Sequence, residues 1–390
     1  MQQSDFNHYA FQTEMPAVPV LMSVRNEEIL IKKALASIVR AIVYYKDSLD
    51  DWNYLNAGPS FPIYVCDNNS SDNTKLKIRE FMNESARILA KYNIGIKIID
   101  EKKQGKVYAL RALINCLEND ESAEKFDNVI FTDGDIQWET NFYYEMVTFK
   151  KNNPSIKLIG TKLIPDNKKI NFWGKAEVIP YYGYGESANS GHGTFSCFIS
   201  GMGYMADKSV LHYLKDEIPP VIGNEDVALS VLIGKENIHI LNSTGIYYYV
   251  SENLVQFIRI RGRHIREQYR IFRWLKKWKE NNISKDERAG LNKASLRRFA
   301  RNWARMRFYS ITECRSLPYL ISFYKSTRRF NLSGNFLKWL ESIPAVQEGM
   351  FFFLVFYPSC LAVYLFVKII FYIQSLYHNK AGWEPVRSFD

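Results

Sequence analysis

Short apolar runs alternate with longer segments of helical periodicity over the first 165 residues. The apolar runs predict strands at 18–24, 61–67, 94–100, 128–135 and 156–163. Between them, apolar residues recur at helical spacing and predict helices at 28–45, 74–91 and 105–118. Strands that alternate with helices in this way indicate an α/β fold with a parallel, doubly wound (Rossmann-like) sheet.

Polar residues gather directly after three of the predicted strands. Arg25, Asn26 and Glu27 follow the first strand, the segment 67–70 ends the second, and the segment 133–135 ends the fourth. Doubly wound sheets bind their ligands outside the carboxyl ends of the strands. The pattern therefore predicts a single ligand site at this edge of the sheet.

Asp133 and Asp135 flank a single glycine after the apolar residues 129–131. Two such carboxylates can share a divalent cation and leave positions open for phosphate oxygens, and Mn²⁺ or Mg²⁺ prefers these ligands. An isolated Asp-Gly-Asp is also typical of a solvated turn. Its place after a buried strand favours the metal site.

Three further polar segments carry candidate chemistry, each with a structural alternative. Asp67 can accept hydrogen bonds from ribose hydroxyls or a base edge, while Asn69 and its neighbours can instead cap the following helix. Lys106 begins a helix that can face a diphosphate, or belongs to an ordinary polar loop. Glu225 and Asp226 start a helix, where a carboxylate can act as a general base or simply favour the helix dipole.

Charge and cysteine usage narrow the class of protein. The net charge of +10 is uneven, because residues 259–329 hold 21 Lys and Arg against 5 Asp and Glu, which leaves −6 for the remainder. The aromatic residues interleaved there suit an anionic membrane surface or nucleic acid. The five cysteines lack disulfide or zinc spacing and indicate reduced thiols, and the N-terminus does not resemble a secretory signal.

An apolar run beside the basic segment favours the membrane over nucleic acid. Residues 350–373 carry one charge, Lys368, and a helix of that length covers about 36 Å, enough to cross a bilayer core. Pro358 leaves a single span and a re-entrant hairpin both open, and a buried core helix is the remaining alternative. The positive-inside rule then predicts a membrane-associated protein whose catalytic domain is cytoplasmic.

These observations divide the chain into five parts. We expect an N-terminal tail at 1–16, a catalytic α/β domain at 17–250, basic and aromatic interface helices at 251–342, a membrane segment at 343–377 and a tail at 378–390.

Six motifs occur in an order that resembles the family 2 glycosyltransferases of the GT-A fold, over roughly residues 17–270. They are "SVRNEE" (23–28), "VCDNNSSDNT" (65–74), "QGKVYALRALI" (104–114), "TDGD" (132–135), "SGMGYMADKSVL" (200–211) and "NED" (224–226). The resemblance implies a nucleotide-sugar-binding domain and an inverting transfer of a hexose or N-acetylhexosamine from a nucleotide sugar, a UDP-sugar by expectation. The acceptor would be a lipid-linked or glycan hydroxyl.

The resemblance also implies roles for individual residues. Asp226, with Glu225 beside it, would be the catalytic base, and Asp133 and Asp135 would bind Mn²⁺ or Mg²⁺ and the diphosphate. The donor would be held by residues of the first three motifs and by Asp133. The acceptor or diphosphate side would be formed by a glycine of the fifth motif and by residues of the segment 256–263, which follows the six motifs. The donor set is Arg25, Glu27, Asp67, Asn69, Lys106 and Asp133, and the second set is Gly201, Gln256, Arg259 and Arg263.

Three alternative functions would each be expected to show sequence features that differ from those of this chain. Polysaccharide synthases of this family carry Q-x-x-R-W and several membrane helices, whereas here Ile260 stands at the tryptophan position of "QFIRIRGRH" (256–264). We therefore expect a single-addition transferase. A nucleotidyltransferase usually has a glycine-rich first loop, and "SVRNEE" has no glycine. A scaffold with a decayed site would not need carboxylates at every matching motif.

Overall fold

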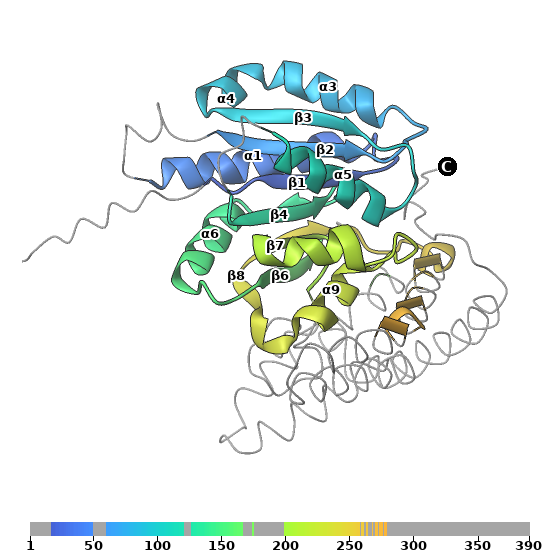
Figure 1. The fold of residues 1–390 in the computed structure, drawn as a ribbon. Helices are drawn as coiled ribbons and strands as arrows, with labels where there is room; N and C mark the ends of the chain where they lie inside the picture. Colours follow the sequence, from blue (N-terminus) through green and yellow to red (C-terminus); the bar gives the residue numbers. More distant parts are fainter. Residues whose placement is uncertain are drawn as a thin grey trace, which may run out of the picture.

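A mixed β-sheet organises the part of the chain that the structure describes. The computed structural model describes residues 17–49, 60–120, 126–166, 174 and 199–257, with single residues and short stretches from 259 to 278. Within these ranges the sheet has eight strands in the order β3-β2-β1-β4-β7-β6-β8-β5. Figure 1 shows the blue and teal strands at one side of this sheet and the green and yellow strands at the other.

The first half of the sheet is parallel, as the sequence predicts. It consists of β1 (Val20–Val24), β2 (Phe61–Asp67), β3 (Ile94–Asp100) and β4 (Asn128–Asp133). The register pairs Val24 with Asp67 and Ser23 with Asp133. The polar residues that end these strands therefore lie at one edge of the sheet.

The second half of the sheet corrects the prediction of a wholly parallel sheet. Its strands are β5 (Gln137–Trp138), β6 (Leu158–Pro165), β7 (Gly203–Asp207) and β8 (Ile238–Tyr248). β7 runs antiparallel to both β4 and β6, while β6 and β8 are parallel and β5 is antiparallel to β8. Only β6 was expected, since β7 lies at the end of a glycine-rich stretch and the apolar pattern of β8 is interrupted by the polar residues 242–244.

Helices cover both faces of the sheet. They are α1 (Ile31–Asp47), α3 (Thr74–Glu84), α4 (Ala86–Lys91), α5 (Lys106–Glu118), α6 (Phe142–Asn152) and α9 (Glu225–Ile233), with short turns η2 (Lys208–Val210), η3 (Tyr213–Glu217) and η4 (Lys235–Asn237). The predicted helix 28–45 begins three residues later, after a turn in which the Glu27 carbonyl accepts from the N–H groups of Leu30 and Ile31. The predicted helix 74–91 is interrupted at Ser85.

Alternating strand residues divide the core into two layers. On β1, Val20, Met22 and Val24 pack with α1, α3 and α6, whereas Leu21 packs on the opposite face with α5 and α9. The same alternation holds on β2 and β4. Because successive side chains of a strand point to opposite faces, both layers are buried by one sheet.

The C-terminal regions of the chain are described only in part. Ile271 and Leu275 pack into the same core layer as α5 and α9. No helix among the described residues has the length and apolarity needed to span a bilayer. The predicted membrane segment 343–377 and most of the predicted interface helices lie outside the described residues.

A buried tyrosine ties α6 to the start of β1 and allows the packing to be tested. The Tyr143 hydroxyl donates to the Val18 carbonyl over 2.8 Å and accepts from the Val18 N–H over 2.6 Å. Tyr143→Phe leaves buried backbone groups without this partner, so we expect a loss of about 1–3 kcal/mol in unfolding free energy, measured by urea denaturation. Tyr144→Phe, at the neighbouring and half-buried position, is the control and should change it by less than about 0.5 kcal/mol. Equal effects of the two variants would contradict the assignment.

Candidate active site

An asparagine at the end of β2 fixes the start of α5. Asn68 is fully buried, its Oδ1 accepts from the Gly105 N–H over 2.8 Å, and its Nδ2 donates to the Lys103 carbonyl over 2.8 Å. Gly105 has a φ of 143°, a conformation that side chains rarely adopt. The backbone is thus held where Lys106 becomes the first residue of the helix.

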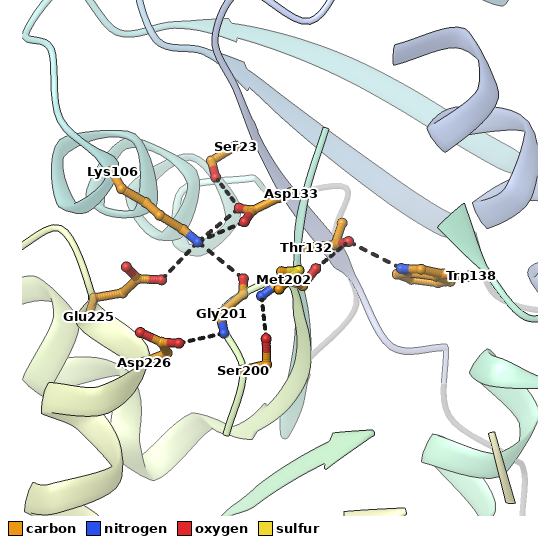
Figure 2. A network of polar contacts seen from close by, with 10 residues as sticks. All are labelled: Ser23, Lys106, Thr132, Asp133, Trp138, Ser200, Gly201, Met202, Glu225 and Asp226. Carbon is orange, nitrogen blue, oxygen red and sulfur yellow. Dashed lines mark hydrogen bonds and ion pairs between the residues drawn. The ribbon is translucent and has the colours of Figure 1, made fainter. Parts of the chain in front are cut away.

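Lys106 extends from this point into a cluster of acidic groups at the carboxyl edge of the sheet (Figure 2). Its Nζ lies 2.9 Å from Asp133 Oδ1 and 3.1 Å from Glu225 Oε1, and it donates to the Gly201 carbonyl over 3.1 Å. Ser23 Oγ donates to Asp133 Oδ1 over 3.3 Å. One ammonium group therefore joins β4, α9 and the loop before β7.

Gly201 connects this lysine to Asp226. The Gly201 N–H donates to Asp226 Oδ2 over 2.6 Å, while the Gly201 carbonyl accepts from Lys106. A Cβ atom at residue 201 would lie 3.1 Å from both Asp226 Oδ2 and Lys106 Nζ. Glycine is favoured here because a side chain would press against both charged groups.

Hydrogen bonds to β4 and α9 hold the loop that carries Gly201. The Met202 carbonyl accepts from the Asp133 N–H and from Thr132 Oγ1, each over 3.2 Å, and Trp138 Nε1 donates to Thr132 Oγ1 over 3.1 Å. Ser230 Oγ accepts from the Ile199 N–H and donates to the Asp226 carbonyl. The position of Gly201 therefore depends on both halves of the sheet.

Burial and charge shift the pKa values of the cluster. Burial raises the pKa of Glu225 to about 8, against the opposing effect of Lys106. Burial also raises the pKa of Asp226, while Lys106 and the N–H groups of Val227 and Gly201 act to lower it. Burial alone would lower the pKa of Lys106, but Asp133, Glu225 and Asp226 together raise it. The cluster thus holds a charged lysine and a carboxylate, Asp226, with increased proton affinity.

A second acidic group lies at the end of β2. Asp67 is 7% exposed, and its Oδ1 is buried without a hydrogen-bond donor among the described residues. Beside it, the loop after β1 is fixed to the loop after β2: the Asn26 N–H donates to Ser70 Oγ, and the Glu27 N–H donates to Thr74 Oγ1. Asp67 is an acceptor in a rigid setting that suits a ligand with hydrogen-bond donors.

The structure brings together some of the residues that the sequence predicts. Lys106, Asp133, Gly201, Glu225 and Asp226 form one connected cluster. Arg25, Glu27 and Asp67 lie at the ends of the neighbouring parallel strands, and Asn69 is exposed with a φ of 58°.

The remaining predicted residues have other surroundings. Asp135 is half-buried in the turn after β4. The Gln256 side chain accepts from the Glu252 N–H over 2.8 Å and thus binds the preceding turn of its own segment. Arg259 is exposed and Arg263 is half-buried. Their roles on the acceptor or diphosphate side stay predictions.

A metal centre is predicted at Asp133 and Asp135. Among the described residues, no group of three or more His, Cys, Asp or Glu side chains is arranged to hold a metal ion. The carboxylates of Asp133 and Asp135 are oxygen donors of the kind that Mn²⁺ and Mg²⁺ prefer, and these ions commonly take only one or two protein carboxylates beside substrate phosphates. These two carboxylates are therefore chemically suited to hold Mn²⁺ or Mg²⁺.

Sequence reasoning missed two residues on which the cluster depends. Asn68 belongs to the polar segment that ends the second predicted strand, but its role has no local signal because its backbone partners lie 35 and 37 residues further along the chain. Ser230 has no local signal for this role, because the hydrogen bond that holds the loop joins it to Ile199, 31 residues away.

Comparison with known proteins places this site in a family context. The sequence model described as "Glycosyl transferase family 2" matches residues 20–211, from β1 to just beyond β7. No curated protein matches the sequence. The matched range includes Lys106, Asp133 and Gly201 and ends before Glu225.

Solved structures resemble the chain at low sequence identity. The mannosyltransferase PcManGT from Pyrobaculum calidifontis, in complex with GDP-Man and Mn²⁺, aligns with a TM-score of 0.52 and 15% identity over 94% of this chain and 89% of its own. Residues 1–349 of S. aureus TarS with UDP-GlcNAc align at 0.43 and 13% identity over 93% of each chain. Glucosyl-3-phosphoglycerate synthase from Mycobacterium tuberculosis, with Mn²⁺ and UDP, aligns at 0.35 and 15% over 61% and 72%. The first similarity supports the fold.

The raised pKa of Glu225 predicts how stability depends on pH. In the folded chain this carboxyl stays protonated up to about pH 8, whereas its ordinary pKa is 4.5. Between these values the folded state holds the extra proton, so the unfolding free energy should fall as pH rises, by up to about 1.4 kcal/mol per pH unit. Glu225→Gln cannot titrate and should make this fall smaller, as urea denaturation at pH 5, 6.5 and 8 would show. If the unfolding free energy of the wild type and that of Glu225→Gln depend on pH in the same way, the raised pKa of Glu225 is wrong.

Proposed function

Because residues 20–211 belong to glycosyl transferase family 2, this chain is a glycosyltransferase, and we propose that it transfers a sugar from a nucleotide diphosphate sugar to an acceptor hydroxyl with inversion. The observation that carries this proposal is Asp226, a carboxylate of increased proton affinity held beside Lys106 and Asp133. A general base needs a fixed position and a pKa closer to neutrality than that of a free carboxylate.

The reaction assigns a task to each group of the cluster. Asp226 takes the proton from the acceptor hydroxyl as its oxygen attacks the anomeric carbon from the face opposite the leaving group. The bond from that carbon to the diphosphate oxygen breaks, and its electron pair leaves with the nucleoside diphosphate. Lys106 places a positive charge at the same edge of the sheet, where it can oppose the charge that develops on the diphosphate.

Asp67 would recognise the nucleoside of the donor. Its buried Oδ1 lacks a donor among the described residues, and ribose hydroxyls or the N–H of uracil can supply one, whereas phosphate oxygens cannot. We expect a UDP-sugar of the hexose or N-acetylhexosamine type. The similar proteins were solved with GDP-Man, UDP-GlcNAc and UDP, so donors with guanine belong in the test.

Mn²⁺ or Mg²⁺ would be held by Asp133 and Asp135 together with the donor diphosphate. When bound, the cation neutralises the diphosphate and makes it a better leaving group. Asp133 already contacts Lys106 and Ser23, which fixes the carboxylate at the point where the parallel strands end.

The proposed acceptor lies at a membrane surface. The basic segment 259–329 and the apolar run 350–373 are features of the sequence, and both suit a protein bound to an anionic bilayer with its catalytic domain on the cytoplasmic side. We propose a lipid-linked or glycan acceptor at that surface and a single addition for each donor. Gln256, Arg259 and Arg263 would then lie between the catalytic domain and the membrane.

The central test is donor turnover and its dependence on Asp226. We expect the protein to release nucleoside diphosphate from at least one of UDP-glucose, UDP-N-acetylglucosamine and GDP-mannose. Asp226→Asn should lower turnover by about 10²-fold or more and leave donor binding within a few-fold. Asp216→Asn, at an exposed position of η3, is the control and should stay within about twofold. If donor binding collapses in Asp226→Asn, the residue is not the base.

The metal assignment predicts a loss that can be reversed. EDTA should inactivate the wild type, and added Mn²⁺ or Mg²⁺ should restore nucleoside diphosphate release. Asp133→Ala and Asp135→Ala should each reduce this release by about 10²-fold or more, while Asp127→Ala, at an exposed position before β4, should not. Full activity in EDTA would contradict a metal-dependent reaction.

Membrane attachment is tested by salt extraction. The full chain should remain on anionic vesicles at 1 M salt, because burial of an apolar run does not depend on ionic strength. A chain that ends at residue 340 should bind these vesicles at low salt and dissociate at 1 M, since only its basic segment is attracted. A full chain that is soluble without detergent would mean that residues 350–373 are core.

A further inference from the structure

A buried carboxylate lies in the most basic part of the sequence. Glu267 is fully buried, and its Oε1 pairs with Arg270 over 2.5 Å. Ile271 and Leu275 follow at intervals of four residues and pack into the core layer of α5 and α9. Residues at this spacing share one helical face, so Glu267 occupies a core-facing position where a leucine would avoid the cost of burying charge.

The second oxygen of Glu267 binds backbone instead of another side chain. Its Oε2 accepts from the Gly223 N–H over 2.6 Å. A Cβ atom on Gly223 would lie 3.0 Å from Glu267 Cδ, so the carboxylate lies directly against the chain at this glycine. Gly223 precedes Asn224, and the Asn224 carbonyl accepts from the Ala228 N–H in the first turn of α9.

The turn that ends at Gly223 is held at both of its ends. At its start, Arg111 of α5 donates to the carbonyls of Leu214 and Ile218 over 3.1 and 2.9 Å. Within the turn, the Ile222 N–H donates to the Pro219 carbonyl over 3.0 Å. At its end the Gly223 N–H donates to Glu267. The backbone of Lys106 is thus fixed as part of α5. The backbone of Asp226 is fixed through this turn, which Arg111 of α5 and Glu267 hold at its two ends.

We propose that Glu267 is a positioning residue for glycosyl transfer: through the Gly223 N–H it fixes the first turn of α9 and so the orientation of Asp226. This proposal rests on the proposed function, since it takes Asp226 as the base. A base must lie within hydrogen-bond reach of the acceptor hydroxyl, and a displacement of about 1 Å can cost on the order of 10²-fold in rate. Donor binding at the ends of β1, β2 and β4 does not depend on this bond.

The proposal predicts a separation of kcat from KM. Glu267→Leu keeps the buried position apolar and removes the acceptor for the Gly223 N–H, so kcat for nucleoside diphosphate release should fall by at least tenfold while the donor KM stays within about twofold. Release is measured from UDP-glucose, UDP-N-acetylglucosamine and GDP-mannose. Glu267→Gln retains an oxygen that can accept from Gly223 and should recover most of kcat.

A matched control separates this bond from the general docking of the same segment. Trp278 Nε1 donates to Glu217 Oε2 over 3.0 Å, which also ties the segment to the body of the protein but does not involve Gly223. Trp278→Phe should therefore leave kcat within about twofold. If Glu267→Leu does not fold, Gly223→Ala replaces it, because the added methyl group displaces the carboxylate and should reproduce the loss in kcat.

A double-mutant cycle with Asp226→Asn decides between positioning and simple destabilisation. If Glu267 acts through Asp226, Glu267→Leu should reduce the residual release of Asp226→Asn by less than about twofold. A full tenfold loss in that background, or an unchanged kcat in the single variant, overturns the proposal and leaves the proposed function intact. Wild-type turnover in Asp226→Asn, or no release from any of the three donors by the wild type, overturns the proposed function and the positioning role with it.

Discussion

A buried ammonium group shared between carboxylates is the interaction on which this site depends. Lys106 reaches from α5 to Asp133 on β4 and Glu225 on α9, and also to the carbonyl of Gly201. A buried charge without a partner costs several kcal/mol, and Lys106 would be such a charge without these partners. The cluster is therefore stable only when elements from both halves of the sheet lie together, which makes it a constraint on the fold as well as a site.

The two halves of the sheet contribute different parts of the chemistry. The parallel half ends in Asp67 and Asp133, at the edge where α/β sheets bind ligands. The mixed half supplies Gly201 through the antiparallel strand β7, and the helix that follows supplies Asp226. In the proposed function, donor recognition belongs to the first half and proton removal to the second. Lys106 and Gly201 join them through hydrogen bonds and ion pairs.

The sequence predicted the parallel half because each of its strands is a local apolar run followed by a helix. It also placed Asp67 and Asp133 at strand ends, since that position needs only the strand boundary. It did not predict β7 or β8, whose pairing partners lie far away in the chain. The bond from Gly201 to Asp226 and that from Gly223 to Glu267 span 25 and 44 residues, and no local pattern encodes them.

The site depends on compensation between Lys106 and the carboxylates around it, and a stability cycle at pH 7 tests this directly. Lys106→Met should lower the unfolding free energy by about 3–5 kcal/mol, because it leaves these carboxylates without a countercharge. Asp133 pairs with Lys106 over 2.9 Å, so adding Asp133→Asn removes one of these charges and should restore at least about 1 kcal/mol, which makes the double variant more stable than Lys106→Met alone. If the two losses simply add, Lys106 and Asp133 do not compensate each other and the site does not depend on their ion pair.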